Sequence, residues 1–238
     1  METTLHRQLK EHYAGVDGET EVTVDKYRID AIVGEELIEI QLGSLSAIRL
    51  KIERLLKKHR IRIVKPIIER RRIIKLTRKN GKVKHTRWSP KRGNINELFD
   101  ELIYFTRVFP HKNLTLEVPL VVIQEERFPG HGRKRWRRKN DYQVRDQSLL
   151  EVQSSRMFAT ASDMASLIPA DALPSPFDTA QLATAMSVER WFAQRVAYCL
   201  RHFGTIKQAG KKGNALLYEL PVKKKRLKKK RAKKKRVA

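Results

Sequence analysis

Two acidic residues interrupt apolar segments near the N-terminus. In the stretch YRIDAIVGEELIEIQLGS, residues 27–44, Asp30 lies inside an apolar run and Glu39 lies between two isoleucines. Gln41 follows Glu39 by two positions, which puts both side chains on one face of an extended strand. Two carboxylates on a rigid sheet can hold a hard cation such as Mg²⁺ or Mn²⁺, and water bound to that cation can attack a phosphodiester. The pattern predicts metal-dependent phosphodiester hydrolysis, with Asp30 and Glu39 as the metal ligands.

An ordinary sheet offers a second interpretation of these residues. Alternating polar positions are common where one face of a sheet meets water, and Glu39 and Gln41 would then be solvated. Asp30 argues against that interpretation, because Asp is depleted in strands and its neighbours here are apolar. Both interpretations stay open at the level of sequence.

The flanking residues predict the elements that would position this site. An apolar stripe at Leu45, Ile48, Ile52, Leu55 and Leu56 indicates an amphipathic helix over residues 45–59. Alternation and turn residues, including Gly34-Glu35, predict three strands before it and one strand after it, ended by a proline. These four strands are expected at 19–24, 27–33, 36–42 and 60–68, and a further helix is expected at 3–13.

This order and its motif resemble the PD-(D/E)xK nuclease superfamily, which has a restriction-endonuclease-like α/β core of helix, three strands, helix and strand. The fragment YRID…IEIQLGSLS is also similar to the competence-type branch, in which E-x-Q followed by a serine replaces E-x-K. The resemblance covers about residues 1–68. It implies Mg²⁺ (or Mn²⁺) as cofactor and DNA as substrate. The implied catalytic residues are Asp30, Glu39, Gln41 and an early Glu, which is Glu21 with Glu11 and Glu19 left open as alternatives.

Glutamine at position 41 departs from the usual lysine of the motif. A glutamine can orient water, but it carries no charge and cannot exchange a proton. The metal, together with Arg28 or Arg49, would have to supply the missing positive charge. Gln41 therefore marks either an active variant of the site or a site that only binds.

Beyond residue 68 the patterns predict a longer α/β extension. A hairpin with an Asn80-Gly81 turn is expected first, then a helix over 95–107 with Asn94 and Glu97 as a capping box, and a strand over 114–125. A basic linker is expected at 128–146, and helices at 147–158 and 160–168. The predicted domains are therefore 1–127, nuclease-like; 128–146, linker; 147–221, a second smaller domain; and 222–238, a disordered tail.

Residues 177–220 resemble a winged helix-turn-helix. Two helices, 179–186 with Thr179 as cap and 189–203, precede a hairpin with a GKKGN tip. The exposed face of the second helix, on which we also place Ala197, would read DNA and the tip would contact its backbone. The predicted DNA contacts are Arg190, Gln194, Arg195, Arg201, Lys211 and Lys212. Winged helices also pack against proteins, which is the alternative for this segment.

The charge of the chain points to a polyanionic partner. It has 52 Lys and Arg against 26 Asp and Glu, a net charge of +26, of which 12 basic residues lie in residues 223–236. The remaining 26 − 12 = +14 shows that the body is basic by itself. In RKRWRRK, residues 133–139, basic side chains surround one tryptophan and could contact phosphates and stack on a base, or form a solvated linker. We include Arg133, Arg135, Trp136, Arg137 and Arg138 among the predicted DNA contacts.

Composition narrows the class of protein. A single cysteine, Cys199, excludes an intrachain disulfide and a cysteine zinc site, and it is expected in the core. The N-terminus lacks the apolar centre of a signal peptide, so we expect a cytoplasmic protein, nucleoid-associated at most, with no membrane contact. The leading hypothesis is a Mg²⁺-dependent endonuclease acting on duplex DNA, with a homodimer left open. The alternatives are a non-catalytic nucleic-acid-binding or regulatory protein on a degenerate nuclease scaffold, and an RNA-binding, ribosome-associated protein. The whole arrangement looks like an uncharacterised prokaryotic family that pairs the two kinds of domain.

Overall fold

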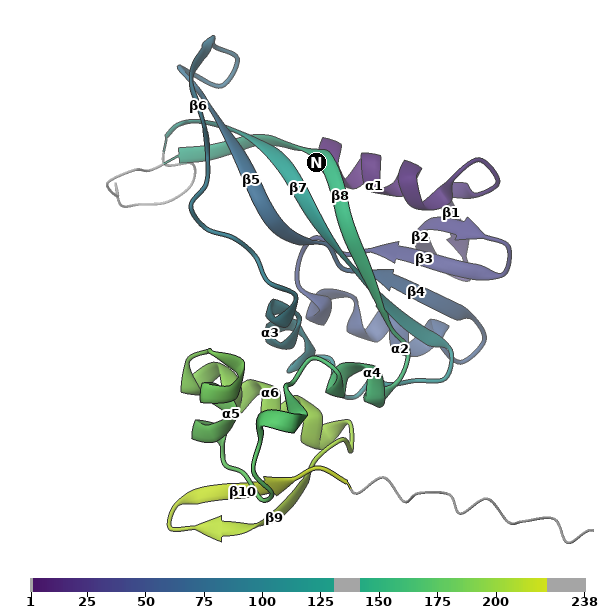
Figure 1. The fold of residues 1–238 in the computed structure, drawn as a ribbon. Helices are drawn as coiled ribbons and strands as arrows, with labels where there is room; N and C mark the ends of the chain where they lie inside the picture. The colour runs from purple at the N-terminus through teal and green to yellow at the C-terminus, as the bar shows by residue number, and fades with distance from the viewer. Residues whose placement is uncertain (1, 131–141, 222–238) are drawn as a thin grey trace, which may run out of the picture.

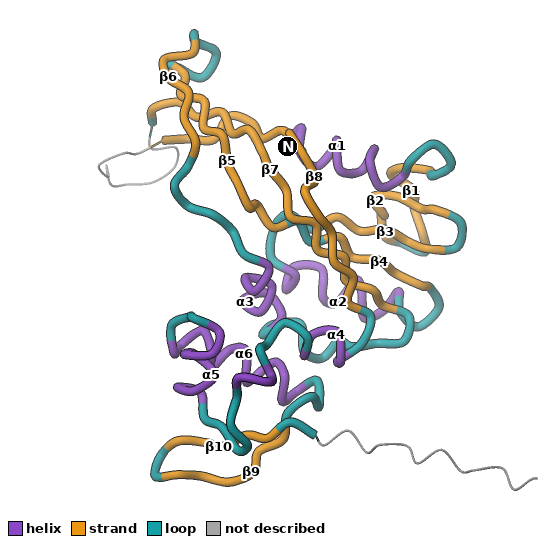
Figure 2. Tube along the Cα trace, in the orientation of Figure 1, coloured by secondary structure: helices purple, strands orange, loops and turns teal. Residues whose placement is uncertain are grey.

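The computed structural model describes residues 2–130 and 142–221, which form a mixed α/β fold. An eight-stranded mixed sheet, six α-helices and a separate two-stranded hairpin make up this part of the chain (Figure 1). One end of the sheet extends away from the helices as a long twisted arm, while the helices α3 to α6 gather at the other side (Figures 1 and 2).

The first sixty-odd residues fold in the order that the sequence predicts. Strands β1, β2 and β3 form an antiparallel meander, and β4 returns parallel to β3 after a helical crossover. The Gly34-Glu35 turn joins β2 to β3, with Gly34 at a φ of 57° that glycine adopts without strain. The elements are α1 (Thr4–Ala14), β1 (Glu19–Val24), β2 (Tyr27–Val33), β3 (Glu36–Ile40), a 3₁₀ turn (Leu45–Ile48), α2 (Arg49–Leu55) and β4 (Arg60–Val64).

A proline divides the central part of the sheet into two branches. Strands β4 and β5 (Ile67–Leu76) follow one another along the same long strand, β7 (Leu114–Pro129), and both run parallel to it. Pro66 lies between them, and since proline has no N–H to donate, the ladder breaks there as the sequence predicts. On the outer side, β3 pairs with β4 while β6 (Val83–Trp88) pairs with β5, so the sheet splits into a helix-covered branch and the arm.

Strand β8 (Tyr142–Phe158) corrects the prediction of a helix at 147–158. It runs antiparallel to β7 along nearly its whole length. The segment forms a strand although its residues favour a helix. Leu149 and Val152 pack beneath α1 and the backbone pairs with β7, so tertiary contacts outweigh local helix propensity. The described ends of the predicted linker at 128–146 are likewise paired strand. Residues 131–141 lie outside the described part of the chain.

The apolar core lies on both faces of the sheet. Leu5 and Leu9 of α1 pack against Ile38, Ile40 and Val121 on one face. On the other face a single cluster runs from α2 through α3 (Leu98–Leu102) into the C-terminal helices, and it includes the residues of the predicted stripe at 45–56. The C-terminal segment thus shares its core with the sheet. It comprises α4 (Ala161–Ala165), a 3₁₀ turn (Ala170–Ala172), α5 (Thr179–Met186), α6 (Arg190–His202), β9 (Lys207–Lys212) and β10 (Ala215–Glu219).

Several predicted helices are shorter than expected. The segment 95–107 holds a 3₁₀ turn (Ile95–Glu97) and then α3, and 160–168 holds only α4 as α-helix. Asp178 is the cap of α5, in a capping box with Gln181, and Thr179 is its first residue rather than its cap. Helices α5 and α6, the hairpin after them and the buried Cys199 agree with the prediction.

Candidate functional site

Asp30 lies where strands β2 and β3 separate. The two strands pair from Ala31 with Ile38 to Val33 with Glu36, and the register stops before Asp30 and Glu39. An Asp30 carboxylate oxygen accepts the backbone N–H of Ile40 at 2.8 Å and so replaces the next ladder hydrogen bond. This bond explains how an aspartate is accommodated inside an apolar strand.

A histidine from α1 faces the same two groups. His6 Nε2 lies 3.0 Å from the Ile40 carbonyl oxygen and 3.5 Å from Asp30 Oδ2, while Nδ1 lies 2.8 Å from Glu2. The contact with Asp30 raises the pKa of His6 to about 9 in spite of partial burial. Burial would raise the pKa of Asp30, but the contacts with His6 and Ile40 outweigh it and hold that pKa below its usual range. A charged imidazolium therefore stands against Asp30 at neutral pH.

Glu39 is buried, with 7% of its surface exposed, and has a cation of its own. Lys51 Nζ from the first turns of α2 lies 2.6 Å from Glu39 Oε2 and also donates to the Arg28 carbonyl oxygen at 2.6 Å. Burial raises the pKa of Glu39, the Lys51 ammonium opposes that shift, and the charge of Asp30 adds to it. The two carboxylates therefore lie close enough to interact electrostatically, with cations supplied from α1 and α2.

Glu21 joins this cluster through Lys10. The Glu21 carboxylate forms ion pairs with Lys10 and with Arg28, and Lys10 Nζ lies 2.5 Å from Glu2 Oε1. An alternating chain of acids and bases thus links Glu21 to Asp30 through Lys10, Glu2 and His6. Glu21 has a φ of 61° and falls opposite Asp30 in the β1–β2 register, where neither residue is paired. The alternatives Glu11 and Glu19 are exposed, and Glu11 contacts Arg7.

Gln41 holds the loop that follows β3. Its side-chain amide donates to the Ser44 carbonyl oxygen at 2.7 Å, and its backbone N–H donates to Val64 at 2.9 Å. Neither contact involves Asp30 or Glu39. Glu21, Asp30 and Glu39 thus lie on the neighbouring strands β1, β2 and β3, each paired with a basic side chain, and Gln41 makes a loop contact.

Three basic residues of the cluster, His6, Lys10 and Lys51, were not predicted, and neither was Glu2. The sequence contained one signal for the first two, because His6 and Lys10 are four residues apart on a helix and so share a face. The expected sources of positive charge were Arg28 and Arg49. Arg28 is engaged with Glu21, and Lys51 fills the place beside Glu39.

The donor atoms of the cluster suit a hard divalent cation. Two carboxylates and the Ile40 carbonyl oxygen are oxygen ligands of the kind that Mg²⁺ prefers, with water completing its shell. The His6 imidazolium marks a place where a positive charge is favoured, because it contacts Asp30 and the Ile40 carbonyl together. Within residues 2–130 and 142–221 no group of three or more His, Cys, Asp and Glu is arranged to hold a metal. A cation here would rest on two carboxylates and would have to displace His6.

Helix α6 shows a mixed surface rather than a purely basic one. Arg190, Gln194 and Arg201 are exposed as predicted, while Arg195 forms an ion pair with Asp100 and lies 4.7 Å from the Trp191 ring centre. Ala197, predicted on this face, is buried, because it packs toward the shared core. Trp191 and Tyr198 are exposed instead.

The remaining predicted DNA contacts lie at the hairpin and in the basic segment. Lys211 and Lys212 are exposed at the end of β9. The predicted contacts Arg133, Arg135, Trp136, Arg137 and Arg138 are outside the residues that the structure describes. In the described ranges, no helix is long and apolar enough to cross a membrane.

Comparison with known proteins identifies the family of the chain. A family model described as "Domain of unknown function (DUF8091)" matches residues 3–159. The chain belongs to this family. The DUF8091 match ends just after β8, so it spans the whole large sheet, including the segment predicted as a linker.

A relative extends the similarity beyond the DUF8091 segment. A Treponema pallidum (strain Nichols) protein described as "Uncharacterized protein" is 30% identical over 219 residues, which is 91% of this chain and 84% of the relative. The C-terminal helices and hairpin are therefore shared in large part. No solved structure matches the chain.

Proposed function

We propose that the chain is a nucleic-acid-binding protein with a metal-dependent, endonuclease-like site at Asp30 and Glu39. The observation that carries the proposal is the placement of both carboxylates beyond the last paired residues of β2 and β3, with Lys51 at 2.6 Å from Glu39. The order of elements, the parallel return of β4 and the resemblance to the PD-(D/E)xK superfamily support the same proposal.

Lys51 resolves the difficulty that Gln41 raises. In the D/E-x-K motif a lysine two residues after the acid supplies a positive charge, which Gln41 cannot supply. Lys51 reaches the same carboxylate from α2, so the charge is present although its position in the sequence differs. In this proposal the Lys51 ammonium stabilises negative charge that develops on a phosphate, and Gln41 shapes the loop beside it.

The proposed metal ligands are Asp30 and Glu39, with Mg²⁺ or Mn²⁺ as the ion. A bound ion would lower the pKa of a coordinated water and offset the growing charge on the phosphate. Asp30 holds the two strands together by accepting the backbone N–H of Ile40. His6 neutralises the Asp30 carboxylate until a metal cation takes the place of His6.

The C-terminal segment supports the nucleic-acid part of the proposal. Three helices followed by a hairpin, with Phe177 bridged to Tyr218 beside the hairpin, are consistent with a winged helix-turn-helix. We propose that Arg190, Gln194 and Arg201 with Lys211 and Lys212 contact duplex DNA.

The test is plasmid nicking by the purified chain with Mg²⁺, Mn²⁺ or chelator. The variants are Asp30→Asn, Glu39→Gln and Lys51→Gln, and Glu35→Gln and Lys57→Gln are controls that change the same charges at exposed positions. We expect metal-dependent nicking that falls by about 10²-fold or more in the three site variants and stays unchanged in the controls. Nicking that persists in both carboxylate variants would refute the proposal.

A non-catalytic binder on the same scaffold is the second candidate. The observation that favours it is the neutralisation of each carboxylate by a cation of the chain itself, His6 for Asp30 and Lys51 for Glu39. Salt-dependent DNA binding with no product under any divalent ion would decide for this candidate.

A further inference from the structure

The arm of the sheet is a strongly basic surface that no predicted contact uses. It consists of the β5–β6 hairpin and the adjoining ends of β7 and β8, and it extends away from the helices (Figure 1). From Arg70 to Trp88 the sequence has nine Lys and Arg and no Asp or Glu. All six residues of β6 are exposed.

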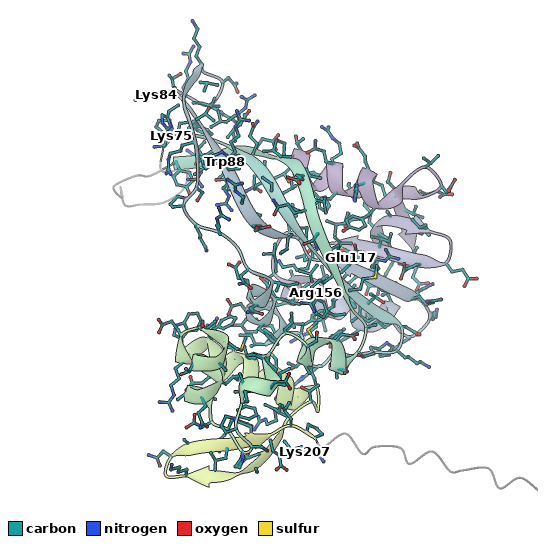
Figure 3. All side chains as sticks on the ribbon, viewed as in Figure 1. Lys75, Lys84, Trp88, Glu117, Arg156 and Lys207 are labelled. Atoms are coloured by element: carbon teal, nitrogen blue, oxygen red, sulfur yellow. The ribbon has the colours of Figure 1, made fainter. Side chains whose placement is uncertain are left out.

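One face of the arm forms a groove. Lys75 lies directly opposite His85 on β6 and beside Arg127 on β7, so these three side chains share a face. The groove has a volume of about 590 Å³. Its walls include Lys75, Lys84, His85, Arg87, Arg127 and Tyr142. Figure 3 shows Lys75 and Lys84 on this arm, far from the helical end of the molecule.

An aromatic ring with one supported face lies in this groove. The Arg127 guanidinium lies 3.9 Å from the centre of the Tyr142 ring, and 44% of Tyr142 is exposed. The guanidinium holds the ring in place, while the exposed part is available to a flat ligand. The phenol thus offers a stacking surface surrounded by cations.

The opposite face of the arm provides a matched aromatic residue. Trp88 lies directly opposite Arg72, and the Arg70 guanidinium lies 4.4 Å from its ring centre. Trp88 is 46% exposed, about as much as Tyr142, but it does not line the groove. Substituting Tyr142 and Trp88 in turn therefore distinguishes binding in the groove from binding to any basic surface of the arm.

We propose that this groove binds a single-stranded segment of nucleic acid. A base stacks on Tyr142, and Lys75, Lys84 and Arg87 contact the phosphates on either side. A single strand is favoured over a duplex because stacking on Tyr142 requires an unstacked base, whereas cations alone would accept either. The inference rests on the nucleic-acid-binding part of the proposed function and is independent of cleavage at Asp30 and Glu39.

The first test measures affinity by fluorescence anisotropy with the full chain. The probes are a labelled oligothymidylate of about 12 nucleotides and a duplex of the same length, at about 0.15 M salt. We expect Tyr142→Ala to weaken single-strand binding about 5- to 100-fold, with Tyr142→Phe near wild type. Trp88→Ala is expected to stay within about twofold, as is duplex binding by Tyr142→Ala.

The second test measures the salt dependence of the same binding. Replacing Lys75, Lys84 and Arg87 by Gln should reduce the slope of log K against log salt by about 2, because each phosphate contact on a single strand contributes about 0.7. The control replaces the exposed Lys26, Lys57 and Lys112 by Gln, with the same change in charge and no expected change in slope.

Three results would overturn the inference. These are equal losses in Tyr142→Ala and Trp88→Ala, a loss in Tyr142→Ala that is as large for the duplex, or equal slopes for the two triple variants. Urea unfolding of each variant identifies a folding defect. Tyr142→Phe is a second variant that keeps the aromatic ring, so it tests stacking without removing the side chain. Plasmid nicking tests Asp30 and Glu39 separately, so failure of the catalytic proposal and failure of the groove give different results.

Discussion

At the scale of single residues, the acidic cluster is neutral because helices on both faces of the sheet supply its cations. Asp30 receives its positive charge from His6 on α1, and Glu39 receives its own from Lys51 on α2. A buried carboxylate without such a partner would be costly, since each would lose hydration without compensation. The ion pairs with His6 and Lys51 therefore stabilise the folded protein as long as no metal takes the place of these side chains.

The pKa of His6 gives this stabilisation a pH dependence. Because contact with Asp30 raises the pKa of His6 from the usual 6.5 to about 9, folding favours the protonated ring. Its contribution is complete below about pH 6.5 and is lost as pH rises through about 9. After allowance for the partial exposure of His6, we expect this contribution to the free energy of unfolding to be about 1–2 kcal/mol. The measurement is the free energy of unfolding in urea for the wild type and for His6→Gln, plotted against pH between these two values. The two curves should converge at high pH, and a constant gap would contradict the assignment.

At the scale of elements, β8 fixes the start of α1. Asp146 on β8 accepts the Thr4 N–H at 3.0 Å and the Thr4 hydroxyl at 2.5 Å, while the backbone N–H of Leu149 donates to Gln8 at 2.8 Å. The strand thus serves as an external cap for a helix that carries His6 and Lys10. The placement of the cluster depends on residues 141 and 142 positions away in the chain.

Removing this external cap should loosen α1 locally. Asp146→Ala is expected to cost about 1 kcal/mol, the usual effect of losing a helix cap, because the Thr4 N–H and hydroxyl then lose their carboxylate acceptor. Hydrogen exchange at the first turn of α1 should rise, and the midpoint of urea unfolding should fall. Asp171→Ala, at an exposed position, is the control. Unchanged exchange at Thr4 would show that the contact contributes nothing.

The helices and strands also show which parts of the fold local sequence patterns can predict. Residues 3–68 were predicted in order because each element there carries its own signal: a stripe at 45–56, a Gly34 turn and a proline at the break. Strand β8 was predicted as a helix because its polar, helix-forming residues cover an edge of the sheet, and only the pairing with β7 reveals a strand. Asp30 and Glu39 could be found from sequence as misplaced acids. Lys51 could not, since its meeting with Glu39 is set by the crossover.

At the scale of the whole molecule, two predicted units share one core. The face of α6 that was expected to belong to a separate domain packs on α3, where Cys199 Sγ lies 3.9 Å from the Phe99 carbonyl oxygen. Phe203 meets Phe109 edge to face, with ring centres 5.3 Å apart. Burial and the charge of Asp100 raise the pKa of Cys199 to about 12, so the thiol is neutral, as a core position requires. The sheet and the helical end should therefore unfold together.

A substitution at this junction tests the shared core. Phe203→Ala should lower the free energy of unfolding by about 3–5 kcal/mol, since it removes a buried ring from an edge-to-face pair. Two tryptophans report on the two ends: with Trp136→Phe and Trp191→Phe the fluorescence follows Trp88 in the arm, and with Trp88→Phe and Trp136→Phe it follows Trp191 on α6. In urea both reporters should give one midpoint, and Phe203→Ala should shift them equally, because the cooperative unit includes both ends. Val16→Ala, at a fully exposed position, should move neither by more than about 0.5 kcal/mol. Two separate midpoints, with only the Trp191 reporter shifted, would show that the helical end is an independent domain in contact with the sheet.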